Sequence, residues 1–310
     1  MSILPVNAKK NAIRPAKGDR LFNGVVAAIL VLVLFIAAYP LYFTVIASLS
    51  DPYSVVKGKV FLWPVGFSLD SYRNVLKESS IWTGYLNSIK YTVFGTLFNL
   101  ALTIPAAYVM SKKRMLGCRI FSTVFLICMY FGGGLIPTYL QIKSIGLLNK
   151  SYTMIFLGGF SIYNMIITRV YFESSIPNEL YESAYMDGAD EFTCFFRIGL
   201  PLSKAIVSVI ALYYSVAHWN GYFSALIYLS KAQYYPLQLV LRNILLLNQG
   251  ALSMIGDLTE EEIAFASEAA YRTETMKYAL IFISSAPLLA AFAFVQKYFV
   301  KGVMVGSLKG

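Results

Sequence analysis

The sequence predicts an all-α polytopic membrane protein, and three observations carry this prediction: the composition, the long uncharged runs and the placement of the basic residues. Hydrophobic residues make up 57% of the chain and charged residues 14%, whereas soluble domains lie near ~45–50% and ~25%. Crossing a hydrocarbon core of ~30 Å takes about 20 helical residues, and a charge at the bilayer centre costs about 2.5–3.5 kcal/mol. Uncharged apolar runs of that length therefore mark candidate transmembrane helices.

Six runs meet this criterion. The first is longer than the core of a signal peptide and lacks a cleavage pattern of small residues, so we expect it to be retained. The fourth is the shortest, and Arg169 at its end can reach the membrane interface. Two shorter runs, 232–241 and 243–256, predict interfacial or surface pieces. The six predicted spans are residues 21–50, 91–111, 120–142, 151–168, 205–230 and 278–296.

Six spans place both termini on one side of the membrane. If that side is the cytoplasm, 15 of the 26 Lys and Arg residues fall in cytoplasmic segments. Basic residues are enriched in short cytoplasmic segments of membrane proteins, so we expect both termini to be cytoplasmic. The segments counted are 1–20, 112–119, 169–204 and 297–309.

The predicted domain organisation follows from this topology. A basic cytoplasmic tail precedes a six-helix transmembrane domain, and a short cytoplasmic tail follows it. Within the transmembrane domain we expect one long cytoplasmic loop and one long external loop. The boundaries are 1–20 for the first tail, 21–302 for the transmembrane domain, 173–204 for the cytoplasmic loop, 231–277 for the external loop and 303–310 for the last tail.

Several function classes find no support in the sequence. No G-x-x-x-x-G-K-[ST] pattern occurs, so the chain does not bind a nucleoside triphosphate by the P-loop mechanism. No carboxylate lies in a predicted span, which argues against a proton-coupled carrier. The net charge of +10 is first a topology signal, since there is no compact basic domain for a nucleic acid. We therefore expect no catalytic centre, no cofactor and no nucleic-acid partner.

The metal-binding residue types are also sparse. Cys118, Cys128 and Cys194 show neither disulfide nor metal spacing, and we interpret them as small apolar fillers. The single histidine, His218, cannot form a metal site alone and predicts a neutral, hydrogen-bonded residue within the fifth span. The glycines of the run 132–134 predict close helix packing or a local break in the third span.

A polar segment between the fourth and fifth spans, ELYESAYMDGADEFTCFFRIGLPLSKA (179–205), is unusual in so apolar a chain. Pro177 suits the first turn of a helix, where Glu179 and Glu182 would lie near the positive end of the helix dipole. Asp187 and Gly188 should end this helix, because glycine accepts the positive φ that terminates helices.

A second short helix should follow, with Asp190 and Glu191 at its start. Phe192, Phe195 and Phe196 then have the i, i+3, i+4 spacing of a single aromatic face. The sequence Gly199-Leu200-Pro201 should turn the chain into the fifth span. Two short helices joined by a glycine hinge and fixed to a span predict a segment that transmits movement.

The residues of this segment carry a resemblance. Glu182-Ser183-Ala184, Gly188 and Ile198-Gly199-Leu200-Pro201 match the E-A-A-x(3)-G-x(9)-I-x-L-P loop of bacterial ABC importer permeases, apart from Ser183 in place of an alanine. Segments along almost the whole chain, such as FLWPVGFSLDSYRNVL and QKYFVKGVMVGSLKG, resemble carbohydrate-importer permeases of the maltose-permease type. They are similar in particular to the Gram-positive branch that handles oligosaccharides and polysaccharide fragments.

The resemblance implies a type I ABC importer permease fold in the bacterial plasma membrane. The chain would form half of a heterodimeric pore with a second, non-identical permease subunit. Two cytoplasmic ATPase subunits, which carry ATP and Mg, would bind the cytoplasmic loops, and an external lipid-anchored binding protein would deliver an oligosaccharide. The residues implied to couple to the ATPase are Glu182, Ala184, Tyr185, Asp187, Gly188, Ala189, Phe192 and Pro201.

A sugar pathway needs aromatic faces, amides and hydroxyls without fixed charge. Candidates at membrane depth are Asn164, Trp219, Asn220 and Tyr222, with Tyr139 near a rim. On the external side, the acidic stretch 256–274 suits either docking of the binding protein or a solvated cap. Which oligosaccharide is carried stays open, and so does a permease for a peptide, an amino acid or another solute. A six-span channel or receptor is the alternative outside this class, although it gives no reason for the Glu182 to Pro201 spacing.

Overall fold

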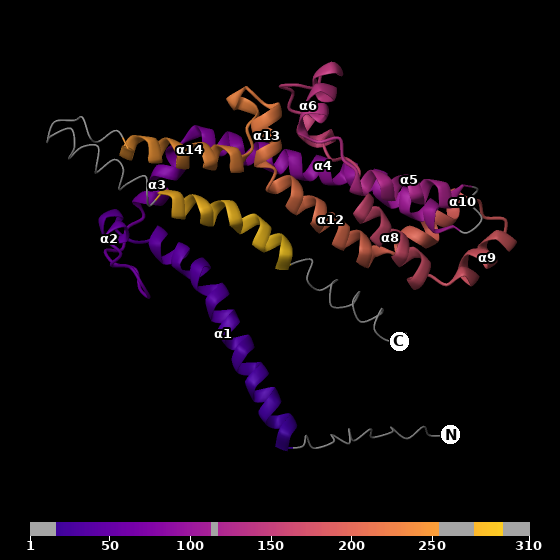
Figure 1. Ribbon diagram of the computed structural model, residues 1–310, viewed down its shortest axis with the longest axis horizontal. Coiled ribbons are helices and arrows are strands. Elements are labelled where there is room, and N and C mark those ends of the chain that lie inside the picture. The colour runs from indigo at the N-terminus through magenta and orange to yellow at the C-terminus, as the bar shows by residue number, and fades with distance from the viewer. Residues whose placement is uncertain (1–16, 113–116, 254–275, 294–310) are drawn as a thin grey trace.

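The computed structural model describes residues 17–112, 117–253 and 276–293, and helices make up the regular structure of these ranges (Figure 1). The two tails, apart from residues 17–20, and the acidic stretch 256–274 lie outside the described residues. The helices outside the segment 178–202 are α1 (Lys17–Ser48), α2 (Pro52–Val56), α3 (Asp70–Lys77), α4 (Ser79–Ser111), α5 (Cys118–Tyr130), α6 (Leu135–Ser144), α7 (Thr153–Phe156), α8 (Ile162–Ser175), α12 (Lys204–Trp219), α13 (Tyr222–Tyr228), α14 (Leu237–Ser253) and the C-terminal helix Met276–Ala293.

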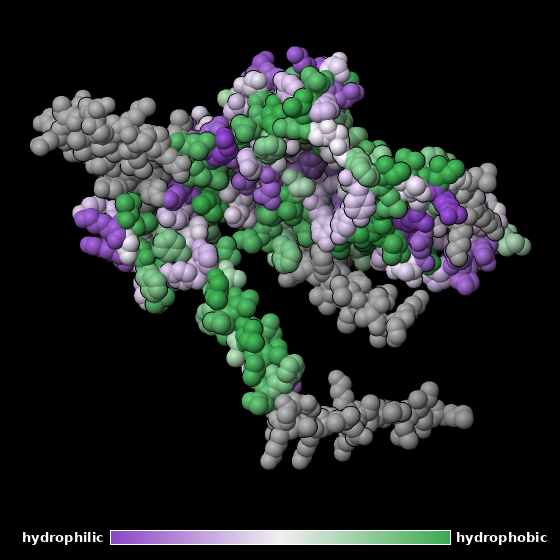
Figure 2. All heavy atoms as spheres, viewed as in Figure 1, coloured by the Kyte–Doolittle hydropathy of each residue, from purple (hydrophilic) through white to green (hydrophobic). Residues whose placement is uncertain are grey.

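Helix α1 extends away from the other helices (Figure 1), and the face of it seen in Figure 2 is apolar. Large apolar side chains are exposed at most positions from Leu21 to Ile36. None of the residues in the most apolar part of α1 is buried within the chain. Only its C-terminal end packs, where Ile46 and Ala47 meet Val55 and Val60. A helix that is apolar all round requires a lipid or protein environment, so the exposed surface of α1 indicates a membrane-embedded helix.

Helix α4 is the central element of the remaining bundle. It packs against α8, α12 and α14, and runs the length of the body, with α3 near one end and α10 near the other (Figure 1). Its small residues permit this close packing: a Cβ at Gly84 would lie 3.1 Å from the Cα of Leu237 in α14. Small residues at helix contacts are typical of membrane bundles, where close backbone approach replaces the hydrophobic effect.

Three described helices are long and apolar enough to span a membrane: Leu21–Ser48, Ser79–Ser111 and Met276–Ala293. Two bent pairs raise the number to five if each is one span. The prediction of six spans is consistent with this arrangement and stays a prediction. The second span begins at Ser79 rather than at residue 91, because Lys90 does not end the helix; its Nζ donates to Ser151 Oγ at 3.0 Å.

The predicted spans three to five are interrupted at glycines. Helices α5 and α6 meet at an angle of 111° around residues 131–134, so of the two interpretations of this glycine run, close helix packing or a local break, the structure shows the break. The fourth run divides into α7 and α8, so that its helix lies at 162–175 and extends past Thr168. The fifth run divides at Asn220 and Gly221 into α12 and α13. These runs look continuous in the sequence because the apolar composition of a run does not show where a helix begins or ends.

The two shorter runs also differ from the prediction. A single helix, α14, passes through both, and only a short 3₁₀ turn forms at Ala232–Tyr234. Arg242, which separated the runs in the sequence, lies within this helix because arginine is a good helix former. The three cysteines are free thiols; Cys194 is buried, Cys118 is half-buried, and Cys128 is exposed on α5 rather than packed within the chain.

Candidate functional site: a coupling segment and a central cavity

The segment 178–202, here called the coupling segment, consists of consecutive short helices at one end of the molecule. They are α9 (Asn178–Met186), α10 (Glu191–Thr193), a π-helical turn (Cys194–Gly199) and α11 (Leu200–Leu202). Pro177 directly precedes α9, as predicted. This end of the molecule lies opposite α3 and α14 (Figure 1).

Helix α9 ends in a Schellman motif, which explains the residue types at its terminus. The amide of Ala189 donates to the carbonyl of Ala184 at 2.9 Å, and the amide of Gly188 donates to the carbonyl of Tyr185 at 3.0 Å. Gly188 has a φ of +81°, and this conformation favours glycine at the position after the helix. The predicted glycine break is confirmed, and it directs the chain from α9 into α10.

The second short helix begins as predicted at Asp190. The Oδ1 atom of Asp190 accepts a hydrogen bond from the amide of Thr193 at 2.9 Å. Hydrogen bonds from Thr193 lower the pKa of the Asp190 carboxyl, since they stabilise its charged form. The helix then continues through the π-helical turn as far as Leu202.

The turn into the fifth span lies at a different place from the predicted one. The helical axis bends by 79° between Glu191–Leu202 and Lys204–Trp219, so the turn is at Ser203 and not at Gly199-Leu200-Pro201. Gly199 is helical and buried, and a Cβ there would lie 3.2 Å from the Tyr108 ring. Its small size therefore serves close packing against α4, whereas Pro201 sits in the first turn of α11.

The prediction of a single aromatic face at Phe192, Phe195 and Phe196 is wrong. Phe195 is buried, with 8% of its surface exposed, whereas Phe192 and Phe196 are exposed at 74% and 59%. Consecutive residues of a helix point about 100° apart, and the boundary of the buried cluster passes between Phe195 and Phe196. Phe195 holds the coupling segment to its own chain, and the other two phenylalanines face outward.

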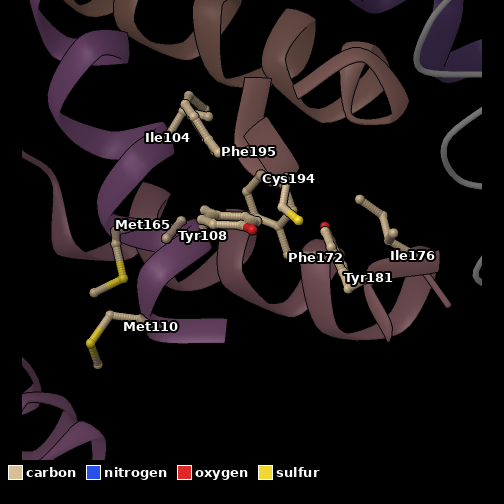
Figure 3. Close-up of a cluster of buried hydrophobic side chains, with 10 residues drawn as sticks. Ile104, Tyr108, Met110, Met165, Phe172, Ile176, Tyr181, Cys194 and Phe195 are labelled. Atoms are coloured by element: carbon tan, nitrogen blue, oxygen red, sulfur yellow. The ribbon is translucent and has the colours of Figure 1, made fainter. Parts of the chain in front are cut away.

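The buried side of the coupling segment forms an anchor cluster of Tyr108, Phe172, Tyr181, Cys194 and Phe195 (Figure 3). Tyr108, from the C-terminal end of α4, lies at its centre. The centroid of its ring is 5.6 Å from that of Phe172, 6.0 Å from that of Tyr181 and 5.0 Å from that of Phe195. Large aromatic rings packed in this way join α4, α8 and α9 to the π-helical turn.

Polar contacts border the anchor cluster. Glu191 accepts hydrogen bonds from the hydroxyls of Tyr108, at 3.2 Å, and of Tyr185, at 2.8 Å. The ammonium of Lys112 lies 3.0 Å from the centroid of the Tyr181 ring. Burial lowers the pKa of Lys112 and raises the pKa of Tyr181 to about 12. Lys112 and Glu191 thus add charged contacts between the end of α4 and the coupling segment.

The outer side of the coupling segment is hollowed. A groove of about 450 Å³ is lined by residues that include Ala184, Asp187 and Pro201, together with Leu180 and Leu202. The structure therefore brings three of the predicted coupling residues together. Glu182 and Tyr185 line a smaller hollow of the coupling segment, of about 200 Å³, beside Lys112. The coupling segment also carries exposed apolar side chains: Leu180, Met186, Phe192, Phe196 and Leu202.

A central cavity of about 330 Å³ lies between α4, α8 and α12, and its lining carries no Asp, Glu, Lys or Arg side chain among the described residues. Hydrogen bonds fix several of its polar groups. Asn99 Nδ2 donates to the carbonyl of Gly158 at 3.1 Å, and Asn99 Oδ1 lies 3.4 Å from His218 Nε2. The Tyr214 hydroxyl lies 2.7 Å from the Thr103 hydroxyl. The polar residues of the lining are Tyr91, Asn99, Ser161, Asn164, Tyr213, Tyr214, His218 and Ser224.

One of the five predicted pathway residues, Asn164, lines this cavity. Trp219 is buried on another side of α12, where its Nε1 donates to the carbonyl of Ser284 at 2.9 Å. The ring of Tyr139 stacks on that of Tyr228, with centroids 6.2 Å apart. Asn220 is exposed at the end of α12, and Tyr222 lines a separate hollow.

Sequence reasoning missed the residues that α12 contributes to the cavity. Within α12, Tyr213 and Ala217 are four residues apart, as are Tyr214 and His218. Residues four apart lie on one face of a helix, so helical periodicity could have found this face. Among the described residues no group of three His, Cys, Asp or Glu side chains is placed to hold a metal ion.

Apolar helices, an uncharged polar cavity between them and an anchored segment with an outward groove define a membrane permease. Comparison with known proteins agrees with this class. The chain belongs to the family of binding-protein-dependent transport system inner membrane components, which matches residues 79–305. The resemblance inferred from the sequence is thereby confirmed, and with it the assignment to a component of a transport system.

Individual relatives match almost the whole chain. The polygalacturonan/rhamnogalacturonan transport system permease protein YtcP of Bacillus subtilis (strain 168) is 35% identical, and the match covers 94% of this chain and 99% of YtcP. Protein LplC of the same organism is 35% identical, with 94% and 93% covered. A chain in the crystal structure of a bacterial ABC transporter involved in the import of the acidic polysaccharide alginate has a TM-score of 0.81 and 33% identity, with 92% of this chain and 99% of that chain covered.

Proposed function

We propose that this chain is a permease subunit of an ATP-driven, binding-protein-dependent importer of oligosaccharides. The observation that carries the proposal is the anchored coupling segment, because a groove that receives a partner can move the spans only if it is fixed to them. Two cytoplasmic ATPase subunits, which hold ATP and Mg, would bind this segment through Glu182, Tyr185, Phe192 and the groove. Closure of the ATPase subunits would then tilt the spans between inward-open and outward-open states.

The remaining parts of the assembly follow from the same reasoning. A second, non-identical permease would cover the exposed apolar surface of α1 and complete the pore. A lipid-anchored binding protein would deliver sugar on the external side, and both termini would be cytoplasmic. The names of the relatives, which refer to polygalacturonan, rhamnogalacturonan and galactooligosaccharides, support a carbohydrate as the solute. The uncharged polar lining of the central cavity agrees with this class.

The experiment that tests the proposal is affinity purification of the full chain from its native host in a mild detergent, followed by mass spectrometry. We expect a second six-span permease, an ATPase and a sugar-binding lipoprotein to be recovered with it. Recovery with a binding protein for peptides or amino acids would support a permease for that solute instead. Recovery of the chain alone, under conditions that preserve other membrane complexes, would contradict the proposal and favour a channel or receptor.

A further inference from the structure

A second hollow lies beside the central cavity and contains a positive charge. Its volume is about 420 Å³, and its lining comprises Tyr222, Gln238, Leu241, Arg242, Leu245 and Leu246. The two hollows border the same two segments of the chain. Gly221 lines the central cavity and Tyr222 the second hollow, while Pro236 lines the central cavity and Gln238 the second hollow. The second hollow therefore neighbours the central cavity at both of these segments.

Arg242 is the only charged residue of α14, LQLVLRNILLLNQGALS, and as a whole residue it is half-buried. The two ion pairs found among the described residues join Arg73 to Asp70 and Arg169 to Glu173, so no described carboxylate forms an ion pair with Arg242. Placing a guanidinium beside three leucines costs free energy unless an anion compensates for the lost water. The hollow thus has a cation without a described counter-charge.

The other groups of the hollow suit a particular kind of anion. A guanidinium binds a carboxylate through two parallel hydrogen bonds. The amide of Gln238 and the hydroxyl of Tyr222 can bond sugar hydroxyls, and the Tyr222 ring and the leucines offer apolar surface to the faces of a pyranose. The central cavity alone provides no such cation among its described lining residues.

We infer that Arg242, with Gln238 and Tyr222, binds a carboxylate of an acidic oligosaccharide, a chain of uronic acid residues, beside the central cavity. This inference rests on the proposed function and narrows its substrate class. Two relatives named for acidic polysaccharides, polygalacturonan and alginate, agree with it. Arg242 acts here as a specificity-determining residue, because a neutral sugar would not need its charge.

The test measures uptake by the complete importer, purified from the host and reconstituted in proteoliposomes with its binding protein. The probes are labelled oligogalacturonate and the same oligomer after reduction of its carboxyl groups. For Arg242→Gln we expect a loss of oligogalacturonate uptake of about tenfold or more, equivalent to about 1.4 kcal/mol, with little change for the reduced oligomer. Arg242→Lys should retain part of the activity, and Arg73→Gln, an exposed arginine, serves as the matched control.

The outcomes separate this inference from the proposed function. Uptake of the reduced oligomer but not of oligogalacturonate by the unaltered importer would overturn the inference and leave the oligosaccharide permease intact. Equal losses for both probes in Arg242→Gln would overturn it as well, since Arg242 would then act on assembly or on a protein partner. Transport of neither probe by the unaltered importer would overturn the inference and leave open which oligosaccharide the proposed permease carries.

A second measurement does not depend on transport. In Gln238→Cys, we measure the rate at which the thiol reacts with an anionic methanethiosulfonate, divided by its rate with a neutral one. This ratio should be about tenfold higher in Gln238→Cys than in Gln238→Cys/Arg242→Gln. Modification at position 238 is followed by mass spectrometry, which separates it from the three native cysteines. Equal ratios in the two variants would show that the hollow does not attract anions and would overturn the inference.

Discussion

Gly188 ends helix α9 with a φ of +81°, and no atom outside its immediate neighbours lies within 4 Å of where a Cβ would be. The requirement for glycine is therefore conformational and not steric. Gly95 shows the opposite case, because a Cβ there would clash with the imidazole ring of His218 while its own backbone is helical. One glycine shapes the coupling segment and the other permits the contact between α4 and α12.

The first prediction concerns Gly188→Val. We expect uptake to be lost and less ATPase to be recovered with the complex, because a left-handed backbone costs a side-chain-bearing residue about 1–2 kcal/mol and α9 would lose its orientation. Membrane insertion should be unchanged, as measured by the amount of protein in the membrane fraction. Gly58→Val is the matched control, since Gly58 has a φ of +69° with open space around it and lies far from the coupling segment. Normal uptake by Gly188→Val would refute the role of this turn.

The second prediction concerns the central cavity. Gly95→Ala should displace the His218 ring from Asn99 and reduce uptake about tenfold or more, as expected for a clash in a well-packed core that costs ~1–3 kcal/mol. Gly95→Ala combined with His218→Ala should recover part of the thermal stability that Gly95→Ala alone loses, because the second change removes the clashing ring. Gly24→Ala, in the exposed part of α1 with no neighbour within 4 Å, is the control. If the losses of thermal stability from the two substitutions add up in the double variant, the predicted clash between Gly95→Ala and the His218 ring would be contradicted.

At the scale of elements, the coupling segment combines features of local and distant origin. The end of α9 at Gly188 and the start of α10 at Asp190 depend on a few neighbouring residues, and both were predictable from the sequence. The inward orientation of Phe195 was not, because it depends on packing against Tyr108, which lies more than 80 residues earlier in the chain. The bend lies at Ser203 and not at the predicted Gly199-Leu200-Pro201. Of the residues that line the outward groove, Ala184, Asp187 and Pro201 were named from the resemblance.

The third prediction tests the link between α4 and the coupling segment. Glu191→Ala removes the acceptor of the Tyr108 and Tyr185 hydroxyls, and a buried donor left unpaired costs about 1–3 kcal/mol. We expect a lower thermal unfolding midpoint and weaker retention of the ATPase during purification. Glu173→Ala, which removes a partly exposed ion pair with Arg169, should have a smaller effect, since such pairs contribute about 0–1 kcal/mol. Equal effects of the two variants would mean that Glu191 does not fix the coupling segment.

At the scale of the whole molecule, the coupling segment and the short helices α2 and α3 lie at opposite ends of α4 (Figure 1). The central cavity lies along α4 between these ends, since Tyr91 and Asn99 of α4 both line it. This arrangement fits a protein in which a movement at one end changes access to a cavity farther along the same helix. It also fits the predicted topology, in which residues 51–90 are external and 173–204 are cytoplasmic.

The fourth prediction tests that topology. In a variant with the three native cysteines replaced by serine, Lys57→Cys should react with a membrane-impermeant maleimide on intact cells. Ser2→Cys and Ser307→Cys should react only after the membrane is opened, because both termini are expected in the cytoplasm. Labelling of either terminal cysteine on intact cells would contradict the predicted orientation and with it the cytoplasmic position of the coupling segment.

The sequence by itself determined the membrane class, the helical content and the residue types at the start and end of the short coupling helices. These features depend on composition and on interactions within a turn or two of the chain. The tertiary structure alone decided where α12 turns, which phenylalanine is buried, and that Asn164 lines the cavity while Trp219 does not. Those outcomes depend on packing between α4, α8 and α12, which brings together residues too far apart in sequence for any local pattern to record.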